Sequence, residues 1–118
     1  MKSKLKVDSN YPMEVTLSVI GGKWKAVILF RLMNGSPCRF AELRRQIPGI
    51  SERMLTQQLR ELEQDEIVHR KVFPEVPPKV EYSITDYGKT LHPIIEVMYV
   101  WGRKYSKRIK AREEKMKS

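Results

Sequence analysis

Residues 50–86 read ISERMLTQQLRELEQDEIVHRKVFPEVPPKVEYSITD, and this stretch decides the fold. Ser51 can accept a hydrogen bond from a free backbone N–H of a first helical turn, and Glu52 places a carboxylate at the positive end of the helix dipole. Apolar residues then recur at helical spacing, as Leu55, Leu59 and Leu62. After Asp65 the period changes to two, which is typical of strands. The stretch predicts a capped amphipathic helix, two strands and the start of another helix.

A second face of the predicted helix is polar, and it carries Arg53, Thr56, Gln57 and Arg60. Arginine can bond guanine O6 and N7 with two hydrogens, glutamine can do the same to adenine N6 and N7, and threonine offers a hydroxyl or a methyl. These residues therefore form a candidate base-reading set. The alternative is that they are ordinary solvated residues on the outer face of a surface helix.

A shorter helix is predicted just before this one, over residues 40–47, with Phe40, Leu43 and Ile47 facing inward. Pro48, Gly49 and Ile50 then form a tight turn. Two helices joined by such a turn are typical of a helix-turn-helix.

Residues 68–85 are predicted to form a β-hairpin, because apolar and polar side chains alternate in both of its halves. Residues 74–78 between the halves read PEVPP. Each proline lacks the N–H that a sheet needs and fixes φ, so this segment should be a stiff, protruding loop. Lys79 is expected at the tip of this wing. The residues expected to contact DNA phosphates are Ser51, Arg44, Arg70, Lys71 and Lys79.

These elements predict a mainly α protein with a small β-hairpin, in the α+β class, with the architecture of a winged helix-turn-helix. The chain resembles the HxlR-type winged helix-turn-helix transcriptional regulators of bacteria, which are MarR-like. The resemblance is carried by GGKWK at residues 21–25, RFAELRR at 39–45, PGIS at 48–51, LTQQLRELE at 55–63 and VEYSIT at 80–85.

The resemblance covers about residues 11–102 and implies a dimeric DNA-binding repressor or activator. It implies that the helix from Ser51 enters the major groove and that the hairpin lies against the backbone or minor groove. Many redox-responsive members carry a cysteine directly before a proline near the start of the domain. This chain has Tyr11 before Pro12, so a thiol switch at that position is absent.

The sequence divides into a flexible arm (1–10), the winged-helix domain (11–102) and a basic helix extension or tail (103–118). Helices are also expected over residues 13–20 and 24–32, and a last helix from about Tyr87. Apolar residues on this last helix cover more than one stripe, so it needs burial nearly all round. The residues expected to meet a second subunit are Leu91, Ile94, Ile95, Met98 and Trp101. The alternative is a helix buried wholly inside its own chain.

The net charge of +9 is concentrated at the two ends of the chain. Residues 1–8 carry +2 and residues 103–118 carry +6, whereas residues 9–102 carry only +1. The high net charge is therefore weak evidence that the central domain binds nucleic acid. The ends could attract phosphates without regard to sequence, or they could be solvated segments that aid solubility.

No pattern for catalysis, a cofactor or a metal is found. His69 and His92 lack cysteine or carboxylate partners at metal-ligand spacing, and no phosphate-binding glycine loop is present. Cys38 is a candidate redox sensor, because Arg39 and a helix start beside it would favour the thiolate. The alternative is that this lone cysteine is a small buried apolar side chain.

The sequence contains no apolar run long enough to span a membrane and no signal peptide, so a cytoplasmic, nucleoid-associated protein is expected. The expected partners are a double-stranded DNA operator, read as an inverted repeat, and a second copy of the chain. No pattern identifies a small-molecule or electrophile effector. Two alternative functions stay open at this point, a winged-helix protein-interaction module and a general basic nucleic-acid binder.

Overall fold

The computed structural model describes residues 7–117, so residues 1–6 of the predicted arm lie outside the described residues. The chain enters through a turn in which the Asp8 carbonyl accepts from the Tyr11 N–H at 3.0 Å. Asp8 Oδ1 also accepts from the Asn10 N–H at 2.9 Å. This turn leads directly into the first helix, α1 (Pro12–Ile20).

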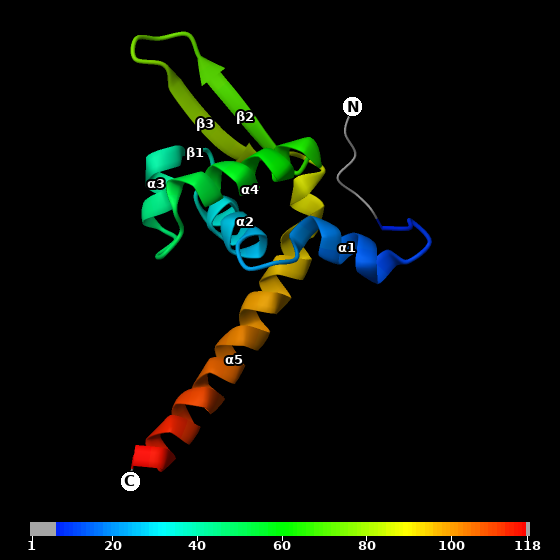
Figure 1. Ribbon diagram of the computed structural model, residues 1–118, viewed down its shortest axis with the longest axis vertical. Helices are drawn as coiled ribbons and strands as arrows, with labels where there is room; N and C mark the ends of the chain where they lie inside the picture. The colour runs from blue at the N-terminus through cyan, green and yellow to red at the C-terminus, as the bar shows by residue number, and fades with distance from the viewer. Residues whose placement is uncertain (1–6, 118) are drawn as a thin grey trace.

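Four helices, three strands and one 3₁₀ turn follow α1 within the described residues. Their order is α2 (Lys25–Asn34), β1 (Cys38–Arg39), α3 (Phe40–Arg45), α4 (Glu52–Gln64), β2 (Val68–Phe73), β3 (Lys79–Ile84), η1 (Gly88–Leu91) and α5 (His92–Lys117). Figure 1 shows α2, α3 and α4 gathered at the base of the β2–β3 hairpin, while α5 leaves this group as a long rod.

The core is built around α2, whose Ile28, Leu29 and Leu32 are fully buried. The predicted apolar face of α4 belongs to the same core cluster, and all three of its leucines are buried. Burial of a leucine is worth about 1.5–3 kcal/mol, so this face is sufficient to fix α4 on the core. The other buried apolar residues are Ile20, Cys38, Leu43, Ile47, Ile50, Ile67, Val68, Tyr82 and Ile95.

The sheet has three antiparallel strands in the order β1-β3-β2. The predicted hairpin is confirmed, with Val68 opposite Ile84 at its base and Phe73 opposite Lys79 at its far end. The two-residue strand β1 was not predicted; it pairs Cys38 with Tyr82 and thereby ties the start of α3 to the hairpin. The fold class is confirmed as mainly helical with a small antiparallel sheet.

The helix boundaries of α1 and α2 differ from the predicted ones by one or two residues, and two further differences concern α3 and the last helix. α3 ends at Arg45 rather than at Ile47, and the last helix begins as the 3₁₀ turn η1 before α5 starts at His92. Thr85 explains the second difference, because its hydroxyl accepts from the Gly88 N–H at 2.8 Å and also donates to the Glu66 carbonyl at 2.7 Å. Thr85 therefore caps the 3₁₀ turn and ties it to Glu66, just after the end of α4.

α5 runs over 26 residues and leaves the domain after its first turns. Ile95 is its buried residue, and Tyr99 stacks on Phe30 of α2 with ring centroids 4.7 Å apart. Beyond these contacts the helix projects away from the core (Figure 1). No helix within residues 7–117 is long and apolar enough to cross a bilayer.

Candidate nucleic-acid interface

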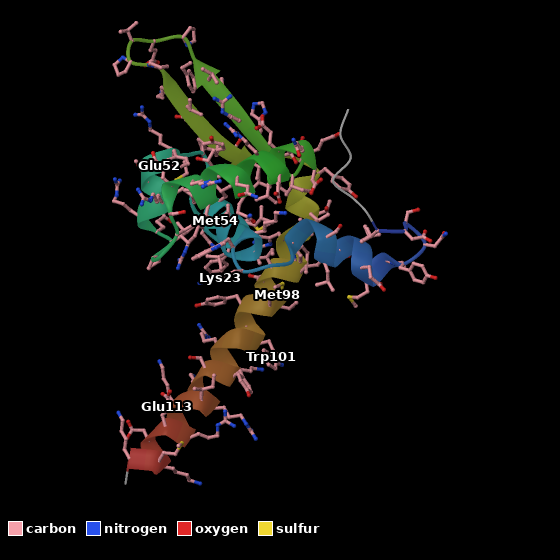
Figure 2. All side chains as sticks on the ribbon, in the orientation of Figure 1. Lys23, Glu52, Met54, Met98, Trp101 and Glu113 are labelled. Atoms are coloured by element: carbon pink, nitrogen blue, oxygen red, sulfur yellow. The ribbon has the colours of Figure 1, made fainter. Side chains whose placement is uncertain are left out.

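The amino end of α4 is capped as the sequence predicted. Ser51 has an extended backbone, and its Oγ accepts a hydrogen bond from the Met54 N–H at 3.0 Å. Glu52 follows in the first turn, next to the positive end of the helix dipole. Figure 2 labels Glu52 and Met54 at this end of α4, beside α3. The cap fixes where the helix begins and therefore which side chains share its outer face.

The outer face of α4 presents the predicted reading residues to solvent. Arg53, Gln57 and Arg60 are exposed, and Thr56 is half-buried. The Thr56 hydroxyl donates to the Glu52 carbonyl at 2.9 Å, so its methyl group and the oxygen lone pairs are what it can offer to a base. The leucine face of the same helix is buried, and the four residues therefore point away from the core on a fixed element.

An ion pair missed by the sequence analysis joins α4 to α2. Lys25 is only 7% exposed, and its Nζ lies 2.5 Å from Glu61 Oε1. A run of acidic residues at the end of a surface helix is ordinarily solvated, but Glu61 instead pairs with this buried lysine. A signal was present, because Lys25 shares the i, i+3, i+4, i+7 spacing of Ile28, Leu29 and Leu32 on the buried face. The pair links the amino end of α2 to the carboxyl-terminal half of α4.

The turn between α3 and α4 is held by its own backbone and by one arginine. Gly49 has φ +88°, a left-handed conformation that favours glycine. Arg44 Nε donates to the Ile50 carbonyl at 3.3 Å, which fixes the guanidinium beside the start of α4. Arg44, assigned from the sequence to phosphate contacts, thus also supports the turn, and its remaining N–H groups stay available.

The hairpin separates its three predicted cations onto two faces. Neighbouring residues of a strand point to opposite sides, so Arg70 lies on one face and Lys71 on the other. Lys71 and Lys79 come together there, with their Nζ atoms 4.8 Å and 4.3 Å from the centre of the Phe73 ring. Lys79 begins β3 instead of occupying the loop tip, and its Nζ lies 3.8 Å from Glu81 Oε2.

Cys38 does not have the surroundings that the sequence suggested. It lies on β1, directly before the Arg39 N-cap of α3 as the sequence predicted, but it is buried. Burial raises the pKa of the Cys38 thiol, the Glu42 carboxylate raises that pKa further, and Arg45 lowers it. The expectation of a favoured thiolate is therefore wrong. Cys38 belongs to the core cluster, beside Gln46, whose Nε2 lies 4.0 Å from its sulfur.

The five residues expected at a subunit contact are divided by the structure into two groups. Ile95 is only 3% exposed and Leu91 is half-buried, so both pack inside their own chain. Ile94, Met98 and Trp101 remain exposed, with Trp101 at 65% and Met98 at 45%. Figure 2 shows Met98 and Trp101 on the part of α5 that leaves the domain.

Within residues 7–117 no group of His, Cys, Asp or Glu could hold a metal ion.

A helix-turn-helix followed by a β-hairpin and a projecting helix defines the winged-helix class of DNA-binding proteins. The chain matches the model of the HxlR-like helix-turn-helix family over residues 19–110, and it belongs to that family. It is a DNA-binding transcriptional regulator of the HxlR type, as the sequence predicted, and its family consists of regulators, not enzymes.

Curated proteins and solved structures agree with this assignment. The chain is 55% identical over 98 residues to the HTH-type transcriptional regulator YdeP of Bacillus subtilis, covering 83% of this chain and 76% of YdeP. The structure resembles that of the redox regulator HypR in its reduced form, with a TM-score of 0.78, 52% identity, and coverage of 85% and 98% of the two chains. The HTH-type regulator YtcD gives a TM-score of 0.76 at 49% identity, with 80% and 96% coverage.

Proposed function

We propose that this regulator binds an inverted-repeat operator as a homodimer and reads it with α4. One observation carries the proposal: α4 is fixed by its Ser51 cap, its buried leucines and the Lys25–Glu61 pair, while a polar face stays solvent-exposed. A rigid helix with such a face fits the major groove of B-DNA, where each base pair shows a distinct pattern of donors and acceptors.

The base-reading residues are Arg53, Thr56, Gln57 and Arg60. Arg53 and Arg60 suit guanine, Gln57 suits adenine, and the Thr56 methyl suits the thymine methyl. Arg53 lies nearest the amino end of α4, the end that contacts base edges in helix-turn-helix proteins. The order of these residues along α4 therefore sets the order of the bases that are read within each half-site.

The phosphate contacts come from the hairpin and from the turn before α4. Lys71 and Lys79 share one face of the hairpin, and Arg70 lies on the other face. Arg44 and Ser51 flank the start of α4. Contacts of this kind position the protein on the duplex but carry little sequence information. We therefore assign to the hairpin a contribution to DNA affinity, and to α4 the recognition of the base sequence.

The subunit contact is formed by an apolar stripe on α5, defined here as Ile94, Met98, Trp101, Tyr105 and Ile109. These residues recur three or four positions apart, all are exposed, and Trp101 stacks on Tyr105 with ring centroids 5.1 Å apart. An exposed apolar surface of this length marks an association site. Packing two such stripes about a two-fold axis places two copies of α4 on successive turns of one face of a duplex.

The test is selection of binding sites from a randomised duplex library, followed by footprinting of the selected DNA at two salt concentrations. We expect a symmetric footprint whose half-sites lie one helical turn apart, about 34–36 Å. Recovery of unrelated sequences that bind equally well would instead indicate a general basic nucleic-acid binder. Absence of DNA binding at low salt by the folded protein would favour the protein-interaction module.

A further inference from the structure

The basic segment of α5, residues 103–117, lies outside the winged-helix core and carries much of the net charge. Residues 103–118 hold eight Lys or Arg and two Glu, whereas residues 9–102 are nearly balanced. The segment is helical to Lys117, so its charges are spaced along a regular element. Positive charge concentrated in this way attracts polyanions.

Three cations of this segment form what we call the basic face, namely Arg103, Lys107 and Lys110. All three are exposed. Residues three and four apart lie on the same side of a helix, and these three lie on the side opposite Trp101, Tyr105 and Ile109. The basic face therefore stays accessible when the apolar stripe is covered by a second subunit.

The basic face has one carboxylate near its carboxyl end, because Glu114 follows Lys110 by four residues on the same helix. No salt bridge found within residues 7–117 engages Lys107, and the Arg103 guanidinium lies over the Tyr99 ring at 5.7 Å. The three residues span about 10 Å along the helix axis at a rise of 1.5 Å per residue. This is a straight row of cations without a pocket, which suits a uniform polyanion better than a small ligand.

The basic face and the hairpin lie at opposite ends of the protomer. The longest dimension of the protein is 58 Å, and Figure 1 shows the hairpin at one end of it and the carboxyl end of α5 at the other. A duplex that lies along α4 and the hairpin is therefore remote from residues 103–117 of the same protomer. Within one protomer, a polyanion on the basic face is therefore separate from the DNA segment on α4 and the hairpin.

We propose that the basic face binds the phosphate backbone of a second DNA duplex, so that an operator-bound dimer bridges two DNA segments. This inference rests on the proposed operator binding by α4 and the hairpin. Operator binding also explains why DNA is the polyanion: neighbouring segments of the same DNA molecule are present at high effective concentration around the bound dimer. The contacts are with phosphates, so they require no particular sequence in the second duplex.

The experiment is a capture assay with two duplexes. A selected operator duplex is immobilised and saturated with the full-length protein, and a fluorescent duplex without the operator sequence is added at several salt concentrations. We expect capture of the second duplex, and we expect R103Q/K107Q/K110Q to lower it by about tenfold or more at low salt. If all six cations of the dimer contact phosphates, the log–log salt slope of capture falls by about 5.

Two further measurements make the assay decisive. K2Q/K4Q/K6Q removes the same charge from the amino-terminal end and should leave capture unchanged. Substitution is preferred to deletion of residues 103–118, because deletion also removes Tyr105 and Ile109 from the apolar stripe. Operator affinity of the triple variant, measured on one short duplex, should match that of the wild type.

Three results would overturn the proposal. Wild-type dimers that fill the operator but capture no second duplex show that bridging does not occur, and they leave the proposed operator binding intact. Equal loss of capture in both triple variants shows a general charge effect. A triple variant that loses affinity for the single operator duplex shows that the basic face contacts the flanks of the same DNA. Failure of operator binding itself would instead reject the proposed function.

Discussion

The two longest described helices, α4 and α5, differ in how far their apolar side chains are buried. α4 buries its leucine face completely in its own chain and leaves a polar face outside. α5 buries Ile95 and leaves a row of large apolar side chains in solvent, including Trp101 at 65% exposure. A helix whose apolar face is buried in its own chain is held in one position. A helix that leaves an apolar stripe exposed has a surface that can pack against another subunit.

The largest expected effect on folding stability distinguishes Ile95 from Val100, which lie five positions apart on α5. Ile95→Ala removes a side chain that is 3% exposed and leaves a cavity, so it should lower the free energy of unfolding by about 2–5 kcal/mol. Val100→Ala, at an exposed position away from the apolar stripe, should change it by about 0.5 kcal/mol or less. Urea unfolding at one fixed protein concentration measures the free energy of unfolding of both variants. Equal losses would contradict the division of α5 into a packed and a free part.

The second prediction tests the apolar stripe itself. The double variant M98D/W101D should yield monomers that keep their helices, because both side chains are exposed in one protomer. A monomer contacts only one half-site and loses the gain from two linked binding events, so operator affinity should fall by about 10²–10⁴-fold. Sedimentation and far-UV circular dichroism measure the two properties. Val100→Asp is the matched control and should remain dimeric; a wild-type protein that sediments as a monomer at micromolar concentration would refute the stripe as an interface.

The third prediction concerns the polar face of α4. Arg53→Ala or Gln57→Ala should each cost about 1–3 kcal/mol of binding free energy on operator DNA and much less on random DNA. Gln64→Ala, an exposed residue of the same type at the far end of α4, should have little effect. Gel-shift titration on both DNAs supplies the comparison. Equal losses on the two DNAs would leave Arg53 and Gln57 as phosphate contacts only.

The smallest expected effect belongs to the hairpin. Lys79→Ala should weaken operator and random DNA by similar factors and reduce the salt slope by about 1 per subunit, because a phosphate contact acts through counterion release. The Glu81 carboxylate at 3.8 Å already offsets part of the Lys79 charge, which keeps the effect small. Lys89→Ala, an exposed lysine beside Asp86 at the start of η1, is the control. An unchanged salt slope for Lys79→Ala would exclude Lys79 from the backbone contacts.

Local patterns were sufficient for the helices and for the hairpin. The Ser51 cap, the leucine spacing of α4 and the alternation on both sides of PEVPP each depend on residues within a few positions of one another. The candidate reading face followed from the same spacing, because the apolar side of α4 determines which residues remain outside. What these patterns could not supply were contacts between distant segments: β1 with β3, and Lys25 with Glu61 across 36 residues.

By itself, the sequence determined the order and type of the main elements, because capping, periodicity and proline restriction are local physical effects. Its motifs also carried the resemblance to the family that the comparison then showed. Tertiary structure alone decided which apolar residues of α5 are core and which are free, since Ile94 and Ile95 are adjacent and chemically identical. It also decided that Cys38 is a buried thiol with a raised pKa. In each case the deciding quantity is burial, which depends on where the rest of the chain packs.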